Sequence, residues 1–275
     1  MNTRYISINS ELYTEEEAKI SVSDLAIQRG FGIFDFLKTV NHKPIFIEDH
    51  FNRFYHSAKE MNLELPFSRS ELRNAVNQLL EKNNIANSGL KFILTGGFSP
   101  DGYQVSTPNL IMVQTPFEID RGNFDKGITL VTYNHQRQLP TIKTIDYLQA
   151  IRLQSFIKAN GADDVLYHNN GQIRECPRAN IFLVTDDKVI TPKTDVLSGI
   201  TRSKILDLQL DGYQIMEEDF TLEAFYAAKE VFITSSTKNA LPVLSIDGKS
   251  IGNGKAGAIT RQINEHIYRL IALEE

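Results

Sequence analysis

Lys143 is the residue whose type and position could start chemistry on a carbonyl group. It follows Pro140 and precedes apolar residues at helical spacing, for which we predict a helix that begins at a Thr144 N-cap and ends near Asn160 and Gly161. A lysine at such a junction can face a pocket, where loss of water favours the neutral amine, a nucleophile toward carbonyl carbons. Most lysines are solvated surface residues, so the rest of the sequence must decide between the two roles.

Two short polar segments and one arginine could hold a phosphate. Gly199–Ile200–Thr201 stands just before a predicted helix, where free N–H groups and a hydroxyl favour an anion. Ser235–Ser236–Thr237 ends a predicted strand, and the Arg53 guanidinium matches phosphate oxygens at two points. Each signal is weak alone, because such a threonine is usually a cap, such a run is usually a loop, and such an arginine is usually in a surface ion pair.

A phosphate site combined with a nucleophilic lysine indicates pyridoxal phosphate as the cofactor. This cofactor needs an amine for its aldehyde and an acidic group against its ring nitrogen, because the protonated ring accepts the electrons of the substrate carbanion. Glu175, at the end of a predicted hairpin strand, is the candidate acid. The alternative for Glu175 is an ordinary solvent-facing position.

The composition is that of a globular protein without a nucleic-acid signature. The chain has 275 residues, 41% hydrophobic and 23% charged, with a net charge of -5 and no basic clusters. Cys176 is the single cysteine, which excludes an intrachain disulfide, and we interpret it as a small core residue rather than a catalytic thiol. No apolar run matches a membrane span or a signal peptide, so we expect a cytoplasmic protein.

The apolar periodicity predicts two α+β domains, 1–116 and 128–275, joined by a loop at 117–127. In the first domain we predict strands at 5–8, 12–13, 44–47, 91–95 and 109–115, and helices at 48–63 and 68–82. Residues 24–38 begin as a loop and end as a strand, with Gly30 and Gly32 allowing close approach of the backbone to another surface. In the second domain we predict strands at 128–133, 164–167, 172–175, 180–184, 188–191 and 231–234, and helices from about 202, at 221–229 and at 255–273.

Taken in order, these residues resemble the class IV aminotransferases, which are the fold-type IV pyridoxal phosphate enzymes. That family includes branched-chain aminotransferases, D-amino acid aminotransferases and aminodeoxychorismate lyases. The resemblance covers nearly the whole chain and rests on the segments 29–38, 48–53, 142–147, 161–164, Glu175 with 180–182, 197–202 and 235–237.

The resemblance implies a role for each matching residue. Lys143 would hold the cofactor as an imine and move a proton between the substrate Cα and cofactor C4′, and Glu175 would pair with the ring nitrogen. The residues that would hold the phosphate are Arg53, Ile200, Thr201 and Ser236, and Leu197 would pack against the ring. The residues expected on the substrate side are Phe34, Phe36, Lys38, Lys91, Tyr147 and Thr237.

The resemblance also implies the architecture of the site. It implies a small N-terminal and a larger C-terminal domain, with the cofactor in the interdomain cleft and no metal. Members are homodimers, in which part of the small domain of one subunit reaches the site of the other.

The residue that binds the substrate carboxylate departs from the family pattern. D-amino acid enzymes of the family use an arginine and a histidine after the third strand, but the segment 94–103 has neither, and the arginine of the branched-chain enzymes is missing too. Tyr147 matches the branched-chain form. We therefore predict that Arg29 binds the carboxylate, with Lys38 and Lys91 behind it, because a guanidinium binds a carboxylate at two points. The alternative for Arg29 is an ion pair at a dimer interface.

We predict an aminotransferase that moves an amino group between D-amino acids and 2-oxoglutarate or pyruvate. A branched-chain L-amino acid aminotransferase is the first alternative and an aminodeoxychorismate lyase the second. From a different class, the chain could be a phosphate-ligand binding module without catalysis, but binding alone needs neither Lys143 nor Glu175.

Overall fold

The computed structural model describes residues 3–118 and 124–274, and the chain divides into two compact units. The first unit consists of Met1–Ile119, Ile142–Asp146 and Glu274–Glu275, and the second of Asp120–Thr141 and Tyr147–Leu273. Residues 119–123 of the predicted loop lie outside the described residues. The limits of the two domains stay a prediction, but Ile142–Asp146 groups with the first unit, whereas the sequence pattern predicts it in the second domain.

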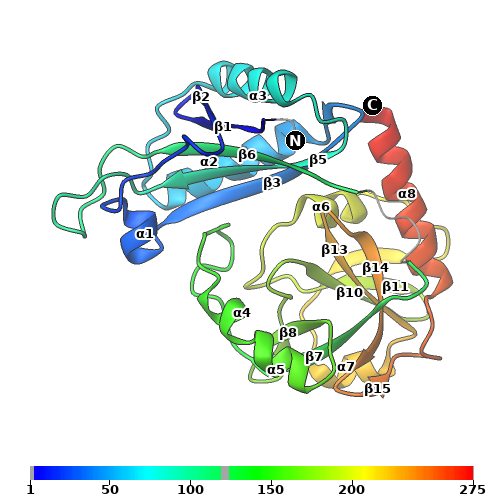
Figure 1. The fold of residues 1–275 in the computed structure, drawn as a ribbon. Helices are drawn as coiled ribbons and strands as arrows, with labels where there is room; N and C mark the ends of the chain where they lie inside the picture. Colours follow the sequence, from blue (N-terminus) through cyan, green and yellow to red (C-terminus); the bar gives the residue numbers. More distant parts are fainter. Residues whose placement is uncertain (1–2, 119–123, 275) are drawn as a thin grey trace. The chain divides into compact units, whose positions relative to one another are not determined.

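The first unit contains a six-stranded sheet with the order β2-β1-β6-β5-β3-β4, in which all neighbours are antiparallel (Figure 1). Its strands are β1 (Tyr5–Ile8), β2 (Glu11–Thr14), β3 (Gly32–Val40), β4 (Lys43–Pro44), β5 (Ser88–Thr95) and β6 (Leu110–Pro116). Its helices are α1 (Leu25–Arg29), α2 (Ile47–Glu60) and α3 (Arg69–Asn83). The predicted strands and both long helices are confirmed within a few residues, except the strand at 44–47, because β4 ends at Pro44 and α2 begins at Ile47.

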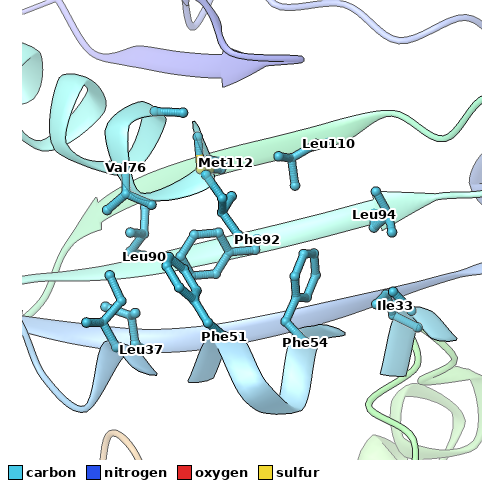
Figure 2. Packing of buried hydrophobic residues seen from close by; sticks show 14 of the residues in the cluster. Ile33, Leu37, Phe51, Phe54, Val76, Leu90, Phe92, Leu94, Leu110 and Met112 are labelled. Carbon is cyan, nitrogen blue, oxygen red and sulfur yellow. The ribbon is translucent and has the colours of Figure 1, made fainter. Parts of the chain in front are cut away.

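The core of this unit lies between one face of the sheet and helices α2 and α3. Successive side chains of a strand point to opposite faces, so Ile33 and Leu37 of β3 face the helices while Phe34 and Phe36 face away. Figure 2 shows Phe51 and Phe54 of α2 packed against Phe92 of β5. The ring centroids of Phe51 and Phe92 are 5.9 Å apart in an edge-to-face arrangement.

The segment Ile142–Asp146 pairs with the start of β3 through an isolated bridge between Ile33 and Thr144. The Phe34 N–H donates to the Lys143 carbonyl at 2.9 Å, and the Ile145 N–H donates to the Gly32 carbonyl at 3.1 Å. The prediction that Thr144 caps a helix is therefore wrong, because pairing with a distant strand fixes this backbone. The expected close approach at Gly32 is confirmed, since a Cβ there would lie 2.7 Å from the Leu94 carbonyl oxygen.

Residues 25–29, predicted as part of a loop, form the short helix α1. The Asp24 side chain accepts a hydrogen bond from the Ala26 N–H, and Gly30 ends the helix with a left-handed φ of 65°. This turn brings the chain into β3 and leaves Arg29 at the exposed end of the helix.

The second unit contains a nine-stranded sheet with the order β12-β11-β10-β13-β14-β7-β8-β9, with β15 paired to β14. Its strands are β7 (Ile128–Asn134), β8 (Asp164–Asn169), β9 (Gln172–Ile173), β10 (Asn180–Val184), β11 (Lys188–Thr191), β12 (Gln214–Glu217), β13 (Glu230–Ser235), β14 (Asn239–Ile246) and β15 (Lys249–Ser250). Its helices are α4 (Leu148–Arg152), α5 (Gln154–Ala159), α6 (Ile200–Leu206), α7 (Leu222–Ala227) and α8 (Ala258–Glu274).

Two features of this sheet show where local sequence signals work and fail. The hairpin of β8 and β9 turns at Asn170 and Gly171, with φ values of 49° and 89°, as the Asn-Gly pair predicts. Strand β14 was not predicted, and it carries Pro242, a residue that normally argues against a central strand. Within the described ranges, no helix has the length and apolar character needed to cross a membrane.

We expect Ser68→Ala to lower the free energy of unfolding by about 1 kcal/mol, because Ser68 caps α3. Its hydroxyl accepts from the Glu71 N–H, and the Glu71 carboxylate accepts from the Ser68 N–H, which forms a capping box. Urea unfolding followed by circular dichroism measures the change. Asn77→Ala, at an exposed position in the middle of the same helix, is the control and should not destabilise the protein. Equal stability of the Ser68→Ala variant and the wild type would contradict the capping role.

Candidate active site

The first unit carries several predicted site residues on the sheet face that points away from α2 and α3. Phe34, Phe36 and Lys38 alternate with the core residues of β3, and the strand register places Lys91 of β5 opposite Phe36. The Lys143 ammonium lies 4.5 Å from the centroid of the Phe34 ring, and the Lys91 ammonium lies 5.8 Å from it. The structure therefore brings the predicted nucleophile and the four predicted substrate-side residues of this sheet to one surface.

The backbone of Lys143 is fixed by two elements of the first unit. Its carbonyl accepts from the Phe34 N–H of β3, and its N–H donates to the hydroxyl of Ser57, a buried residue of α2, at 3.4 Å. A nucleophile needs a defined position relative to the bond that it attacks. Lys143 obtains this position from strand pairing rather than from the helix that the sequence predicted.

Lys38 differs from the other lysines because its side chain is buried. It is 6% exposed, and burial lowers its pKa from 10.5 to about 8. Lys91, on the neighbouring strand, is exposed. Of the two cations predicted behind Arg29, Lys91 is therefore the exposed one and Lys38 the buried one.

Arg53 belongs to a buried cluster with Asp35 and His50. Its Nε donates to Asp35 Oδ2 and its Nη2 to Asp35 Oδ1, both at 2.8 Å, and His50 Nδ1 lies 2.7 Å from Asp35 Oδ1. Burial raises the pKa of the Asp35 carboxyl, but the adjacent Arg53 and His50 together bring it well below its ordinary value. Burial lowers the pKa of His50 more than the adjacent carboxylate raises it.

In the second unit, the buried carboxylate of Glu175 is held by donors on both oxygens. Arg137 Nη1 donates to Oε1 at 2.8 Å, and Oε2 accepts from Asn180 Nδ2 at 3.1 Å and from the Leu197 N–H at 3.0 Å. Glu175 is 4% exposed. A carboxylate held by these donors in a site shielded from solvent is suited to stabilise a positive charge on a neighbouring group.

Asn180 connects Glu175 to the predicted phosphate segment that precedes α6. Its Nδ2 also donates to the Leu197 carbonyl at 2.8 Å, and a Cβ on Gly199 would lie 2.0 Å from its Oδ1. Gly199 is the N-cap of α6, so the first N–H groups, those of Ile200 and Thr201, have no carbonyl partner within the helix.

The second predicted phosphate segment forms the turn between β13 and β14. The hydroxyls of Ser235 and Thr237 lie 3.2 Å apart, and the Ser235 hydroxyl accepts from the Lys238 N–H at 3.2 Å. Ser236 is half-buried and Thr237 is exposed at this turn. Hydroxyl and N–H donors of this kind suit an anion, as the sequence predicted.

Arg29 and Tyr147 are the predicted substrate residues outside these groups. Arg29 is exposed, and its Nε donates to the Gly102 carbonyl at 3.0 Å. Tyr147 precedes α4 and lines a cavity of about 550 Å³ in the second unit, together with Ile151, Lys158 and Arg178. Cys176 is buried, and burial raises the pKa of its thiol, which fits the interpretation as a core residue.

Sequence reasoning assigned no role to Asp35, His50, Arg137 or Asn180. Asp35 had a signal, because it occupies a core-facing position between Ile33 and Leu37, where a charged residue requires a partner. Arg137 had none, since it lies 38 positions before Glu175 and nothing local connects the two.

Comparison with known proteins identifies the family. The family model for amino-transferase class IV matches residues 32–246. The D-alanine aminotransferase of Staphylococcus haemolyticus is 31% identical over 274 residues, which cover 97% of each chain. A putative branched-chain-amino-acid aminotransferase of Methanocaldococcus jannaschii is 28% identical and covers 94% of each chain. Among solved structures, the branched-chain amino acid aminotransferase from Escherichia coli superposes with a TM-score of 0.90 at 26% identity, covering 99% of this chain and 96% of that one.

The chain therefore belongs to the class IV aminotransferases, and the predicted family, fold type and enzyme class are confirmed. This family uses pyridoxal phosphate, which confirms the predicted cofactor. The donor set fits that group, because the chain offers an amine at Lys143, a buried carboxylate at Glu175, and N–H and hydroxyl groups at the start of α6. Amino acids and 2-oxo acids are the substrates of such an enzyme.

We expect Lys38→Met to raise the free energy of unfolding at pH 7, because it removes the cost of burying an ammonium. The pKa of Lys38 is lower in the folded chain than in the unfolded chain, so the unfolded chain binds the proton more strongly. The wild type should therefore gain stability relative to the variant as the pH rises from about 8 to 10.5, by on the order of 3 kcal/mol. Urea unfolding at a series of pH values measures the difference. Lys91→Met, which removes an exposed lysine, is the control and should run parallel to the wild type. A Lys38→Met curve that is also parallel to the wild type would contradict the buried ammonium.

Proposed function

We propose that this class IV aminotransferase transfers the amino group of D-amino acids to a 2-oxo acid such as 2-oxoglutarate or pyruvate. The observation that carries the transfer reaction is the buried Glu175 carboxylate with donors on both oxygens, since a protonated ring nitrogen needs an acidic partner of this kind. Full-length similarity to the D-alanine aminotransferase of Staphylococcus haemolyticus supports the choice of D-amino acids.

The roles of the residues follow from their chemistry. When bound, pyridoxal phosphate supplies an aldehyde for the amino group and a ring that accepts the electron pair released at the substrate Cα. Lys143 Nζ would hold the cofactor and would take the proton from the substrate Cα. Glu175 would keep the ring nitrogen protonated, because its negative charge stabilises an adjacent positive one. The residues that would hold the phosphate are Arg53, Ile200, Thr201 and Ser236, and Leu197 would pack against the ring.

The substrate carboxylate needs a cation, and Arg29 is the proposed one. Its Nε donates to the Gly102 carbonyl, so the guanidinium is anchored at the exposed end of α1 while it stays accessible to a ligand. Lys91 and the buried Lys38, on the sheet, are the further cations that we propose for the substrate carboxylate. The residues that line the substrate side are Phe34, Phe36, Tyr147 and Thr237.

We also propose that the enzyme works as a homodimer in the cytoplasm. Leu148 and Ile151 of α4 are 76% and 63% exposed, and large apolar side chains exposed together favour a protein partner such as a second copy. The single cysteine, Cys176, fits a reducing compartment.

We expect the yellow holoenzyme to bleach fastest with D-alanine as amino donor, more slowly with L-leucine, and not to release pyruvate from aminodeoxychorismate. Absorbance of the bound cofactor during single-turnover mixing measures the first two rates. Faster bleaching by L-leucine would replace the D-amino acid proposal by the branched-chain one.

The same sample tests the role of Lys143. Borohydride should leave the cofactor attached to the wild type and not to Lys143→Ala, because the variant has no amine at this position. A cofactor label on any other residue would contradict the assignment of the nucleophile.

We expect Arg29→Ala to raise the KM for amino acid donors by an amount equivalent to about 1 kcal/mol, because it removes a two-point contact between an exposed guanidinium and the carboxylate. Steady-state kinetics with the preferred donor measures the change. Arg29→Lys keeps the charge but not the planar fork, and should recover only part of the loss. An unchanged KM in Arg29→Ala would remove Arg29 from the substrate site and favour Lys91.

A further inference from the structure

Asp35 is a buried carboxylate to which the proposed reaction gives no task. It occupies a core-facing position of β3, between Ile33 and Leu37, and is 0% exposed. An ionised carboxylate in such a place is costly unless an opposite charge and several donors meet it. The opposite charge and side-chain donors come from one face of α2, where His50 and Arg53 are three positions apart.

Arg53 contacts Asp35 through one edge of its guanidinium. The Nε and Nη2 atoms donate to the two carboxylate oxygens, each at 2.8 Å. A guanidinium is planar and rigid, with donors in a fixed fork. Because the Nε–Nη2 edge is engaged, the plane of the group and the direction of its other edge, Nη1–Nη2, are fixed as well.

Asp35 is itself held in place. Its Oδ1 accepts from the Phe36 N–H at 2.7 Å and lies 2.7 Å from His50 Nδ1. Since an ionised carboxylate only accepts, His50 carries its proton on Nδ1 and donates it. The side chain of Asp35 is therefore tied to β3, to His50 and to Arg53, and it has no room to turn.

We infer that Asp35 is the positioning residue for phosphate binding: it fixes Arg53 so that the Nη1–Nη2 edge meets the phosphate of the cofactor, and His50 fixes Asp35. The inference rests on the proposed role of Arg53 toward the phosphate. The Asp35 carboxylate offsets the positive charge of Arg53. Arg53 therefore helps phosphate binding mainly through the fixed orientation of its N–H donors, not through added positive charge. Removal of the Asp35 charge therefore weakens phosphate binding, although it makes the cluster more positive.

Asp35→Asn in the full-length protein, freed of cofactor, tests this inference. Asparagine keeps the shape but has an accepting oxygen on one side only, so it cannot offer a separate acceptor to each of Nε and Nη2. The Kd of pyridoxal phosphate should rise about tenfold or more. The Kd of pyridoxal, which has no phosphate, should change less than about twofold. Equal weakening of both ligands, or an unchanged or lower Kd for pyridoxal phosphate, would overturn the inference.

Arg53→Lys separates this inference from the proposed function. It keeps the charge and removes the fork, so the same phosphate-selective loss is expected, and Asp35→Asn should add little to it. If Arg53→Lys leaves the ratio of the two Kd values unchanged, Arg53 does not bind the phosphate, and its proposed role fails together with the inference. If Arg53→Lys shows the loss and Asp35→Asn does not, only the inference fails.

His50 provides a second test that leaves Asp35 and Arg53 in place, which matters if circular dichroism shows that Asp35→Asn does not fold. His50→Leu removes a donor to Asp35 and should raise the Kd of pyridoxal phosphate about threefold without affecting pyridoxal. His50→Asn, whose amide can donate from nearly the same position, is the matched control and should stay close to the wild type. Equal affinity of His50→Leu and the wild type for pyridoxal phosphate would overturn the inference.

Discussion

A carboxylate removed from water must be met by donors, and each unit of this protein is arranged around one such group. Asp35 in the first unit and Glu175 in the second are both almost fully buried, and each accepts from an arginine and from neutral N–H groups. Loss of one partner of a buried pair leaves the other charge uncompensated, which costs more than the pair contributes. The stability of the fold therefore depends on each partner of these clusters staying in place.

The fold could be predicted where the burial pattern is local. Helix α2 and strand β3 have apolar residues at their own periods, so the spacing of Phe51, Phe54, Ile33 and Leu37 along the chain is enough to identify the core faces. The prediction failed at Thr144, because residues 142–146 pair with β3 and the helical residues begin only at Leu148. Strand pairing over more than a hundred residues leaves no periodic signal in either segment, so sequence alone placed the start of the helix too early.

The candidate site shows the same division. Lys143, Glu175 and the segment before α6 could be predicted, because their residue types and order match a family pattern. The groups that hold them could not, because Arg137 reaches Glu175, and Ser57 reaches Lys143, only after the chain has folded. Asp35 lies between these cases. Its position among core residues indicates a buried charge, but the identity of its partners requires the structure.

The strand pairing of Ile142–Asp146 also decides how the chain can be divided. The backbone of the first unit is not continuous, since residues 142–146, which follow its last strand by more than twenty residues, pair with β3. A fragment that ends at residue 118 would leave the Phe34 N–H and the Gly32 carbonyl without their partners. The amine of Lys143 would be absent from it as well. The first half of the chain is thus not a separable module, and an autonomous version would need residues 142–146 supplied as a peptide or fused by a new connection.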